Sequence, residues 1–306
     1  MSDCVDHFAT VQDTWSSVLA SPELRAVACA LEAAAIDVGE CVREAATISE
    51  LPPTRRRLEA IQKVVHAATD VAPGAFERFV LGHAVLSYRD KLRSSLVSPT
   101  VKRITCEGLV RFANSRTVLN VADSRFVSLC KMATLRRFAA GQFDWERSGF
   151  PRSWFHRVRP LPALGRLLSV VAFQWRGLGP AFFVHMPVTH PVHALFEGEA
   201  LKSYYRMARS MELQPEVKGL IASAWLHSPA TFEVSPHLAW LNKVFADHGA
   251  VMATTGRAAP DSGVFTRSVE RQRAFDEGRF KPTIGLVVWK RRDMLAWAAA
   301  HPELDR

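Results

Sequence analysis

Three histidines lie within nine residues of one another in the second half of the chain. They are His185, His190 and His193, and Glu197 follows them closely. Imidazole nitrogens and carboxylate oxygens are common ligands of Zn²⁺ and Fe²⁺, and a strand-end histidine joined by ligands from the next loop is a workable geometry. One hypothesis is therefore a zinc or iron enzyme whose site uses His185, His190, His193 and Glu197. The alternatives are that His185 acts as an acid or base without a metal, or that these are loop histidines that cap the backbone or face solvent.

A second group of polar side chains lies at the end of a predicted strand. Residues 219–226 form an apolar run typical of a buried strand, and His227 comes directly after it. Because α/β proteins place their chemistry at the carboxyl ends of strands, His227 is a candidate general base. Ser223 and Ser228 are candidate nucleophiles, although neither lies in a Gly-x-Ser-x-Gly elbow. Tyr204 is a candidate general acid, and ordinary turn, cap and core positions are the alternative for all four side chains.

A glycine-containing turn lies between two apolar runs. The spacing of Gln174-x-x-Gly177-x-Gly179 matches the loop with which GNAT acyltransferases hold acyl-CoA through backbone N–H groups at a helix start. Arg176, inside this turn, would hold an anionic group. On this hypothesis Gln174, Arg176, Gly177 and Gly179 bind the acyl donor. However, Pro180 and the apolar run after it predict a strand rather than a helix, so a β-hairpin turn is the alternative.

The positive charge of the chain is concentrated in one segment. The net charge is +9, and residues 101–180 contain 14 Lys and Arg against 4 Asp and Glu, an excess of ten positive charges. Such an excess attracts phosphates, a CoA-type ligand, nucleic acid or anionic lipid, and the alternative is a solvated arginine-rich face. We favour a small-molecule substrate over nucleic acid as the partner.

The cysteines and the start of the chain bear on the cellular compartment. The five cysteines are odd in number, widely spaced and without a C-x-x-C pair, which argues against a disulfide framework and against a cysteine zinc site. The first residues are acidic where a secretory signal carries lysine or arginine, and no apolar run is long enough for a membrane span. We expect a cytoplasmic protein without a membrane partner.

The elements that must position these residues change in character near residue 141. Residues 8–140 have helical spacing, with a helix start at Ser21-Pro22 and another segment beginning at Ser98-Pro99. We predict one helix from Pro22 to about Ala46, a break at Leu51–Thr54 and a further helix over Arg55–Ala68. This part of the chain predicts a helical domain, residues 1–140.

After residue 141 strands and helices alternate. The predicted strands cover residues 167–173, 181–186, 219–226, 250–254 and 283–289, and the predicted helices cover residues 195–211, 235–248, 266–277 and 291–300. The first two strands would form a hairpin. Such alternation implies a central sheet flanked by helices, over residues 141–306.

The C-terminal half also resembles a known kind of domain. The segments GLIASAWLHSP (219–229), SPHLAWL (235–241) and GRFKPT (278–283) resemble an uncharacterised bacterial protein family. The first is similar to the strand and turn Ser-Trp-Leu-x-Asp-Pro of GNAT-like acyltransferase domains, and the order of elements after residue 181 is similar to the second half of a GNAT fold. The residues His227-Ser228-Pro229 depart from that motif, which has an acid before the proline. The resemblance implies an acyltransferase-like enzyme.

These patterns together predict a mixed α+β chain, with a helical domain over residues 1–140 and an α/β GNAT-like domain over residues 141–306 around a central mixed sheet. The leading hypothesis for function is an acyltransferase-like enzyme that acts on a small molecule with acyl-CoA or another acyl donor. In it, His227 or His185 acts as base and Tyr204 as acid. The alternatives are a metal-dependent enzyme and a non-enzymatic regulatory or nucleic-acid-binding protein that uses the basic segment.

Overall fold

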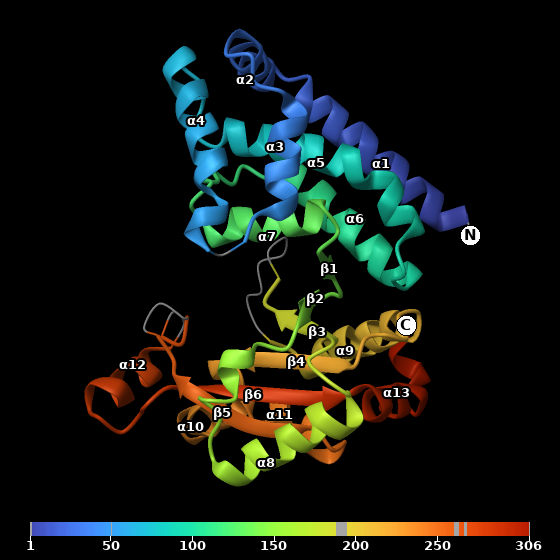
Figure 1. Cartoon of the computed structure of the whole chain (residues 1–306), viewed down its shortest axis with the longest axis vertical. Helices are drawn as coiled ribbons and strands as arrows, with labels where there is room; N and C mark the ends of the chain where they lie inside the picture. The colour runs from blue at the N-terminus through green and yellow to red at the C-terminus, as the bar shows by residue number, and fades with distance from the viewer. Residues whose placement is uncertain (1, 50, 188–194, 260–262, 266–267, 306) are drawn as a thin grey trace. The chain divides into compact units, whose positions relative to one another are not determined.

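The computed structural model describes residues 2–49, 51–187, 195–259, 263–265 and 268–305, and it contains two compact units (Figure 1). Met1–Asp144 forms the first unit, and Trp145–His185 with Leu195–Arg306 forms the second. The chain has mixed α and β structure with a six-stranded sheet in the order β1-β2-β3-β4-β6-β5, which confirms the expected fold class at that level.

Helices dominate the first unit. They are α1 (Ser2–Leu19), α2 (Pro22–Ala33), α3 (Val38–Thr47), η1 (Pro52–Thr54), α4 (Arg56–Ala68), α5 (Ala75–Ser94), α6 (Pro99–Ala113) and α7 (Ser124–Ala133), followed by the short strand β1 (Arg137–Ala139). Helix α5 is central, because α1, α2, α3, α6 and α7 all contact it. A side chain at Gly82 would meet Leu19 at 2.9 Å and Trp15 at 3.0 Å, so a residue without Cβ lets α1 approach α5 closely.

The helix starts follow the capping rules, with one difference from the prediction. Ser21 caps α2 by accepting a hydrogen bond from the Leu24 backbone N–H, as the sequence indicates. The predicted single helix from Pro22 to Ala46 is wrong, because Ala35 takes a left-handed backbone conformation and Asp37 then caps a new helix, α3. The Asp37 carboxylate accepts from Gly39 N–H at 3.0 Å.

The second unit is built around strands β2 to β6 of the sheet. Its elements are β2 (Asp144–Gly149), η2 (Arg152–Trp154), α8 (Leu161–Ser169), η3 (Val170–Gln174), β3 (Pro180–His185), α9 (Glu197–Glu212), β4 (Gly219–Ala224), η4 (Trp225–His227), α10 (Pro229–Val234), η5 (Pro236–Leu238), α11 (Trp240–Asp247), β5 (Val251–Arg257), α12 (Val269–Asp276), β6 (Thr283–Lys290), α13 (Arg291–Ala299) and η7 (Pro302–Asp305). Strand β4 pairs in parallel with β3, whereas β6 pairs antiparallel with both β4 and β5. The sheet is therefore mixed, as expected.

Each face of this sheet carries its own packed layer. One face holds a core cluster that joins Ile221, Leu286 and Val288 of the strands to Leu167 and Val170 of α8 and η3. In Figure 1, α8 lies below the strands, and this cluster is packed between them. The opposite face is aromatic. There the Phe245 ring of α11 lies 5.4 Å from Trp289 of β6, and Trp289 lies 5.2 Å from Trp297 of α13.

The predicted hairpin over residues 167–173 and 181–186 is wrong in its first half. Residues 161–169 form α8, and 170–174 continue it as the π-helical turn η3. The β-branched residues of this run misled the strand prediction, because Ala163, Leu167, Val170 and Val171 are buried at helical spacing against the sheet. The second half is a strand, β3.

The remaining predicted elements of the second unit occur with shifted ends. Strands β4, β5 and β6 and helices α9, α12 and α13 match the predicted segments. The predicted helix over 235–248 is divided into η5 and α11. Within the described part of the chain, none of the helices combines the length and apolar character that crossing a membrane requires.

Candidate functional site

The carboxyl ends of the parallel strands β3 and β4 define the candidate site. The paired residues are Phe182–Leu220, Phe183–Ile221 and Val184–Ala222. Strand β4 then continues, with Ala224 still paired to Gly285 of β6, before the chain turns into η4. Neighbouring parallel strands end at a common edge of the sheet, and such edges are where α/β proteins bind ligands. This edge therefore collects His185 from β3 and the residues that follow β4.

His185 forms the clearest acid–base arrangement of the second unit. It is the last residue of β3, and its Nε2 lies 3.4 Å from Oε1 of Glu146 on β2. The imidazole ring lies 5.4 Å from the ring of Phe183, so apolar contact and a carboxylate both fix its position. The two side chains are 26% and 17% exposed, so both are partly buried at this edge. A carboxylate beside an imidazole orients the ring and stabilises its protonated form.

Sequence reasoning missed Glu146. It lies 39 residues before His185, in a segment that carries no catalytic motif. Only the placement of β2 beside β3 brings the two side chains together. No spacing in the sequence indicates this pair. Strands β2 and β3 are adjacent in the sheet, but the segment that joins them contains α8, which the sequence did not predict as a helix.

His227 is held as a structural residue of the core. Its Nδ1 lies 2.9 Å from Oδ1 of Asn242, and Asn242 Nδ2 donates to the His227 carbonyl at 3.1 Å. Since the Asn242 amide nitrogen is used as that donor, its oxygen is the acceptor, which assigns the imidazole proton to Nδ1. The ring also lies 5.7 Å from Phe245 in an edge-to-face arrangement. His227 therefore fastens the turn after β4 to α11.

Burial decides the protonation of His227. The residue is only 7% exposed. Desolvation lowers its pKa to about 4, although the hydrogen bond to Asn242 acts in the opposite direction. The imidazole is neutral at pH 7, but such a weak and enclosed base is poorly matched to general base catalysis.

Tyr204 and Ser228 are buried in the same way. The Tyr204 ring of α9 lies 5.1 Å from Phe245, so the structure does bring Tyr204 and His227 to one aromatic cluster. Burial raises the pKa of the Tyr204 phenol far above its usual range, which suits a core position rather than an acid. Ser228 is fully buried, and its hydroxyl is hydrogen bonded to that of Thr283. Ser223 is half-buried within β4.

The predicted donor-binding residues lie at the other end of β3. Gln174 ends η3, and Arg176 and Gly177 take left-handed backbone conformations in the turn that precedes β3. At about 3.3 Å per strand residue, this turn lies roughly 16 Å from His185. The structure therefore does not join Gln174, Arg176, Gly177 and Gly179 to the catalytic candidates. A strand follows these glycines, so the helix N-terminus that a phosphate requires is absent there.

The metal hypothesis receives no support from the described residues. Glu197 and Glu199 lie in the first turn of α9 and are exposed, and Glu199 pairs with Lys202 at 3.2 Å. Among the residues that the structure describes, no three His, Cys, Asp or Glu side chains gather in a group that could hold a metal ion. His190 and His193 lie outside the described residues.

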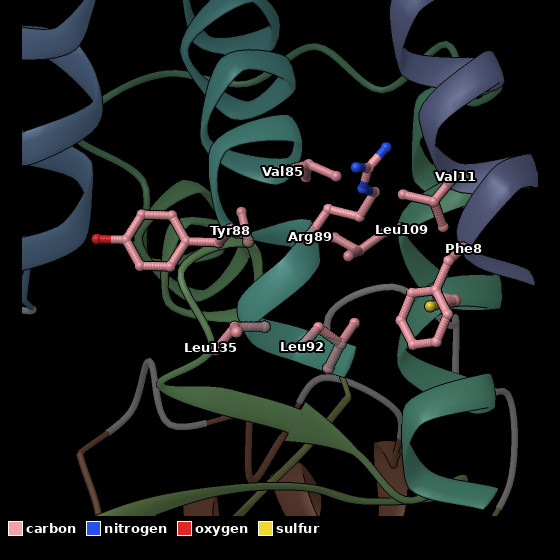
Figure 2. Close-up of a pocket in the computed structure, with 10 residues that line it drawn as sticks. Phe8, Val11, Val85, Tyr88, Arg89, Leu92, Leu109 and Leu135 are labelled. Atoms are coloured by element: carbon pink, nitrogen blue, oxygen red, sulfur yellow. The ribbon is translucent and has the colours of Figure 1, made fainter. Parts of the chain in front are cut away.

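A small pocket in the first unit has a mainly apolar lining, unlike the candidate site. Phe8, Val11, Val85, Leu92 and Leu109 line it, and the side chain of Arg89 extends among them (Figure 2). Arg89 is paired with Asp90 at 3.0 Å. The space of about 240 Å³ includes open solvent, so the enclosed part is smaller than a usual ligand pocket. The pocket is a gap between helices rather than a second candidate site.

Comparisons with known proteins find no match. No family model matches the chain, and neither does a curated protein or a solved structure. What the protein does is therefore inferred from its own residues.

Proposed function

We propose that this protein transfers an acyl group from a thioester donor to a small nucleophile, with the His185–Glu146 pair as general base. The observation that supports this proposal is a partly exposed histidine paired with a carboxylate. This histidine ends β3, which runs parallel to β4, whereas the described pairings of β6 with β4 and β5 are antiparallel. The resemblance of the segment around β4 to GNAT-like domains points to the same chemistry.

The proposed reaction has a definite role for each group. The nucleophile, an amine or a hydroxyl, attacks the thioester carbonyl carbon and gives its proton to His185. Because Nε2 faces Glu146, Nδ1 is the nitrogen that accepts this proton. The carbon–sulfur bond then breaks, and the thiol leaves with a proton from the imidazolium or from water. Glu146 stabilises the imidazolium that exists between these steps.

In this proposal the carbonyl oxygen of the thioester lies beside the end of β4. The described pairing of β3 with β4 stops at Ala222, while β4 continues through Ser223 to Ala224. A backbone N–H in this extension could donate to the developing oxyanion, which is a large contribution in acyl transfer. Phosphate groups of a CoA donor would not be favoured at the start of α9, because Glu197 and Glu199 already occupy its first turn.

Substitution of the two paired residues tests the proposal. A panel of acyl-CoA thioesters of increasing chain length, combined with amine and alcohol acceptors, is followed by mass spectrometry of the products. We expect His185→Gln to lower kcat/KM about 100-fold or more, since removal of a general base commonly costs that much. Glu146→Gln should lower it less and move the acidic limb of the pH profile to lower pH, because the imidazolium loses its carboxylate.

His156→Gln is the matched control, because His156 is exposed and far along the chain from the proposed base. It should retain the wild-type rate, and so should Tyr204→Phe if that phenol is a core group. Full activity in His185→Gln, or no acyl transfer from any thioester, would refute the proposal.

A further inference from the structure

The outward side of α8 and η3 is unusually apolar for a helix surface. Leu161 is 70% exposed, Leu168 is 47% exposed and Phe173 is 79% exposed. The outward positions 161, 165, 168 and 172 recur at helical spacing and are occupied by Leu, Gly, Leu and Ala, all of them exposed. We call Leu161, Gly165, Leu168, Ala172 and Phe173 the α8 ridge. The inward side of the same helix is the buried one, so the apolar ridge is additional to the residues that the fold requires.

Arginines accompany this ridge along its whole length. Arg157 and Arg159 precede it, Arg166 lies within α8, and Arg176 follows η3, and all four are exposed. From Arg147 to Phe196 the chain has six arginines and no Asp or Glu. A solvated helix face normally intersperses both signs of charge, whereas this one combines exposed apolar side chains with positive charge alone.

The combination indicates which kind of partner fits. Nucleic acid would use the arginines, but Phe173 is the single aromatic ring among the five ridge residues, and Leu161 and Leu168 give bases no stacking surface. A protein partner would require a broad patch with a packed centre, and the ridge is a single helix with small residues, Gly165 and Ala172, between its larger ones. An added Cβ at Gly165 would meet no atom within 4 Å, which marks open space between the two leucines. Flexible lipid chains can pack against leucines separated by small residues without a complementary rigid surface.

We infer that the α8 ridge is a peripheral contact surface for an anionic lipid bilayer. The helix lies parallel to the membrane plane, and Leu161, Leu168 and Phe173 enter the boundary between headgroups and acyl chains. The arginines meet the lipid phosphates at the same level. This is the arrangement of interfacial amphipathic helices, which need an apolar face and cationic neighbours but no spanning segment. The sequence predicts no membrane partner because no apolar run is long enough to span a bilayer, and a peripheral surface needs no such run.

Vesicle co-sedimentation of the full chain tests the inference. The probes are phosphatidylcholine vesicles with and without phosphatidylglycerol, at low and high salt. We expect wild-type protein to bind the anionic vesicles and to bind them less at high salt, where charge interactions are screened. Replacing both apolar residues, Leu168→Ser with Phe173→Ser, should weaken binding at least about tenfold. Arg166→Glu should weaken it about tenfold through loss of attraction.

Matched controls separate this surface from general stickiness and from unfolding. Phe275→Ser removes an exposed aromatic ring from α12, and Arg111→Glu reverses an exposed charge on α6. Neither should change vesicle binding by more than about twofold, since neither belongs to the ridge. Circular dichroism should be the same for all four variants, and thermal midpoints should fall only slightly, because no replaced side chain is fully buried.

Three results would overturn the inference. They are no binding to anionic vesicles, wild-type binding by the Leu168→Ser and Phe173→Ser double variant, and tighter binding to duplex DNA or RNA that the double substitution leaves unchanged.

Discussion

His185 and His227 have the same side chain in environments that give it different properties. His185 lies at a sheet edge, partly exposed, with Glu146 at 3.4 Å to stabilise its charged form. His227 is enclosed by Phe245 and Asn242, and burial lowers its pKa to about 4. The first environment holds a partly exposed imidazole beside a carboxylate, whereas the second holds a buried imidazole that fastens a turn.

The lowered pKa of His227 predicts a specific acid sensitivity. Because its folded-state pKa of about 4 lies below the ordinary value of 6.5, the unfolded chain binds more protons between these pH values. Stability is therefore complete above pH 6.5 and is lost as the pH falls through this window. The full loss attributable to His227 is about 3 kcal/mol. Urea denaturation between pH 7 and pH 4 measures it, with His227→Gln lacking this contribution.

His156→Gln is the control for this measurement, because that imidazole is exposed. Its pH dependence should follow the wild type. If His227→Gln lost stability toward pH 4 as steeply as the wild-type protein, the imidazole would not be the buried neutral group described here.

The elements of the second unit show what sequence patterns can and cannot supply. Strands β4, β5 and β6 were predictable because their apolar runs are bounded by turn residues and helix caps. The end of α8 and the turn η3 were not, because the run of leucine, valine, alanine and phenylalanine over residues 167–173 fits a strand as well as a buried helix side. The candidate site could likewise be predicted only in part. His185 was predictable as a strand-end histidine, but its partner Glu146 depends on which strands are neighbours, and local patterns carry no such information.

Replacing two glycines of this unit with alanine should change stability in opposite directions. A Cβ on Gly285 of β6 would lie 2.2 Å from the carbonyl carbon of His227, so the turn after β4 can pack on the strand only if this residue lacks a side chain. Gly285→Ala should destabilise the protein by about 3 kcal/mol or more, since rigid backbone must move. Gly165 in α8 meets no atom within 4 Å. Gly165→Ala should stabilise by about 0.5–1 kcal/mol, the usual gain within a helix.

Chemical denaturation of both variants decides between these directions, and each serves as the control for the other. Equal and small effects of the two substitutions would contradict the close packing of the His227 turn on β6.

At the scale of the whole molecule, cysteines and tryptophans lie in different parts of the chain, so they can report on different units. All five cysteines lie before residue 145, and seven of the eight tryptophans lie at or after it. Cys41, Cys106 and Cys130 are buried, whereas Cys29 is exposed. Burial also raises the pKa of Cys41 to about 11, which slows its reaction further while the first unit is folded. Thiol reactivity therefore reports on the first unit and tryptophan fluorescence mainly on the second.

Because each unit contains its own buried residues, we expect these two probes to give different unfolding midpoints. Trp15→Phe removes the one tryptophan of the first unit, so that fluorescence then follows the second unit alone. Labelling of Cys41, Cys106 and Cys130 along a urea gradient, resolved by mass spectrometry, follows the first. Adding Gly285→Ala to this background should lower the fluorescence midpoint and leave the labelling midpoint in place. If the substitution lowered both midpoints equally, the two units would unfold as a single cooperative structure, and stability assigned to either one would belong to the whole chain.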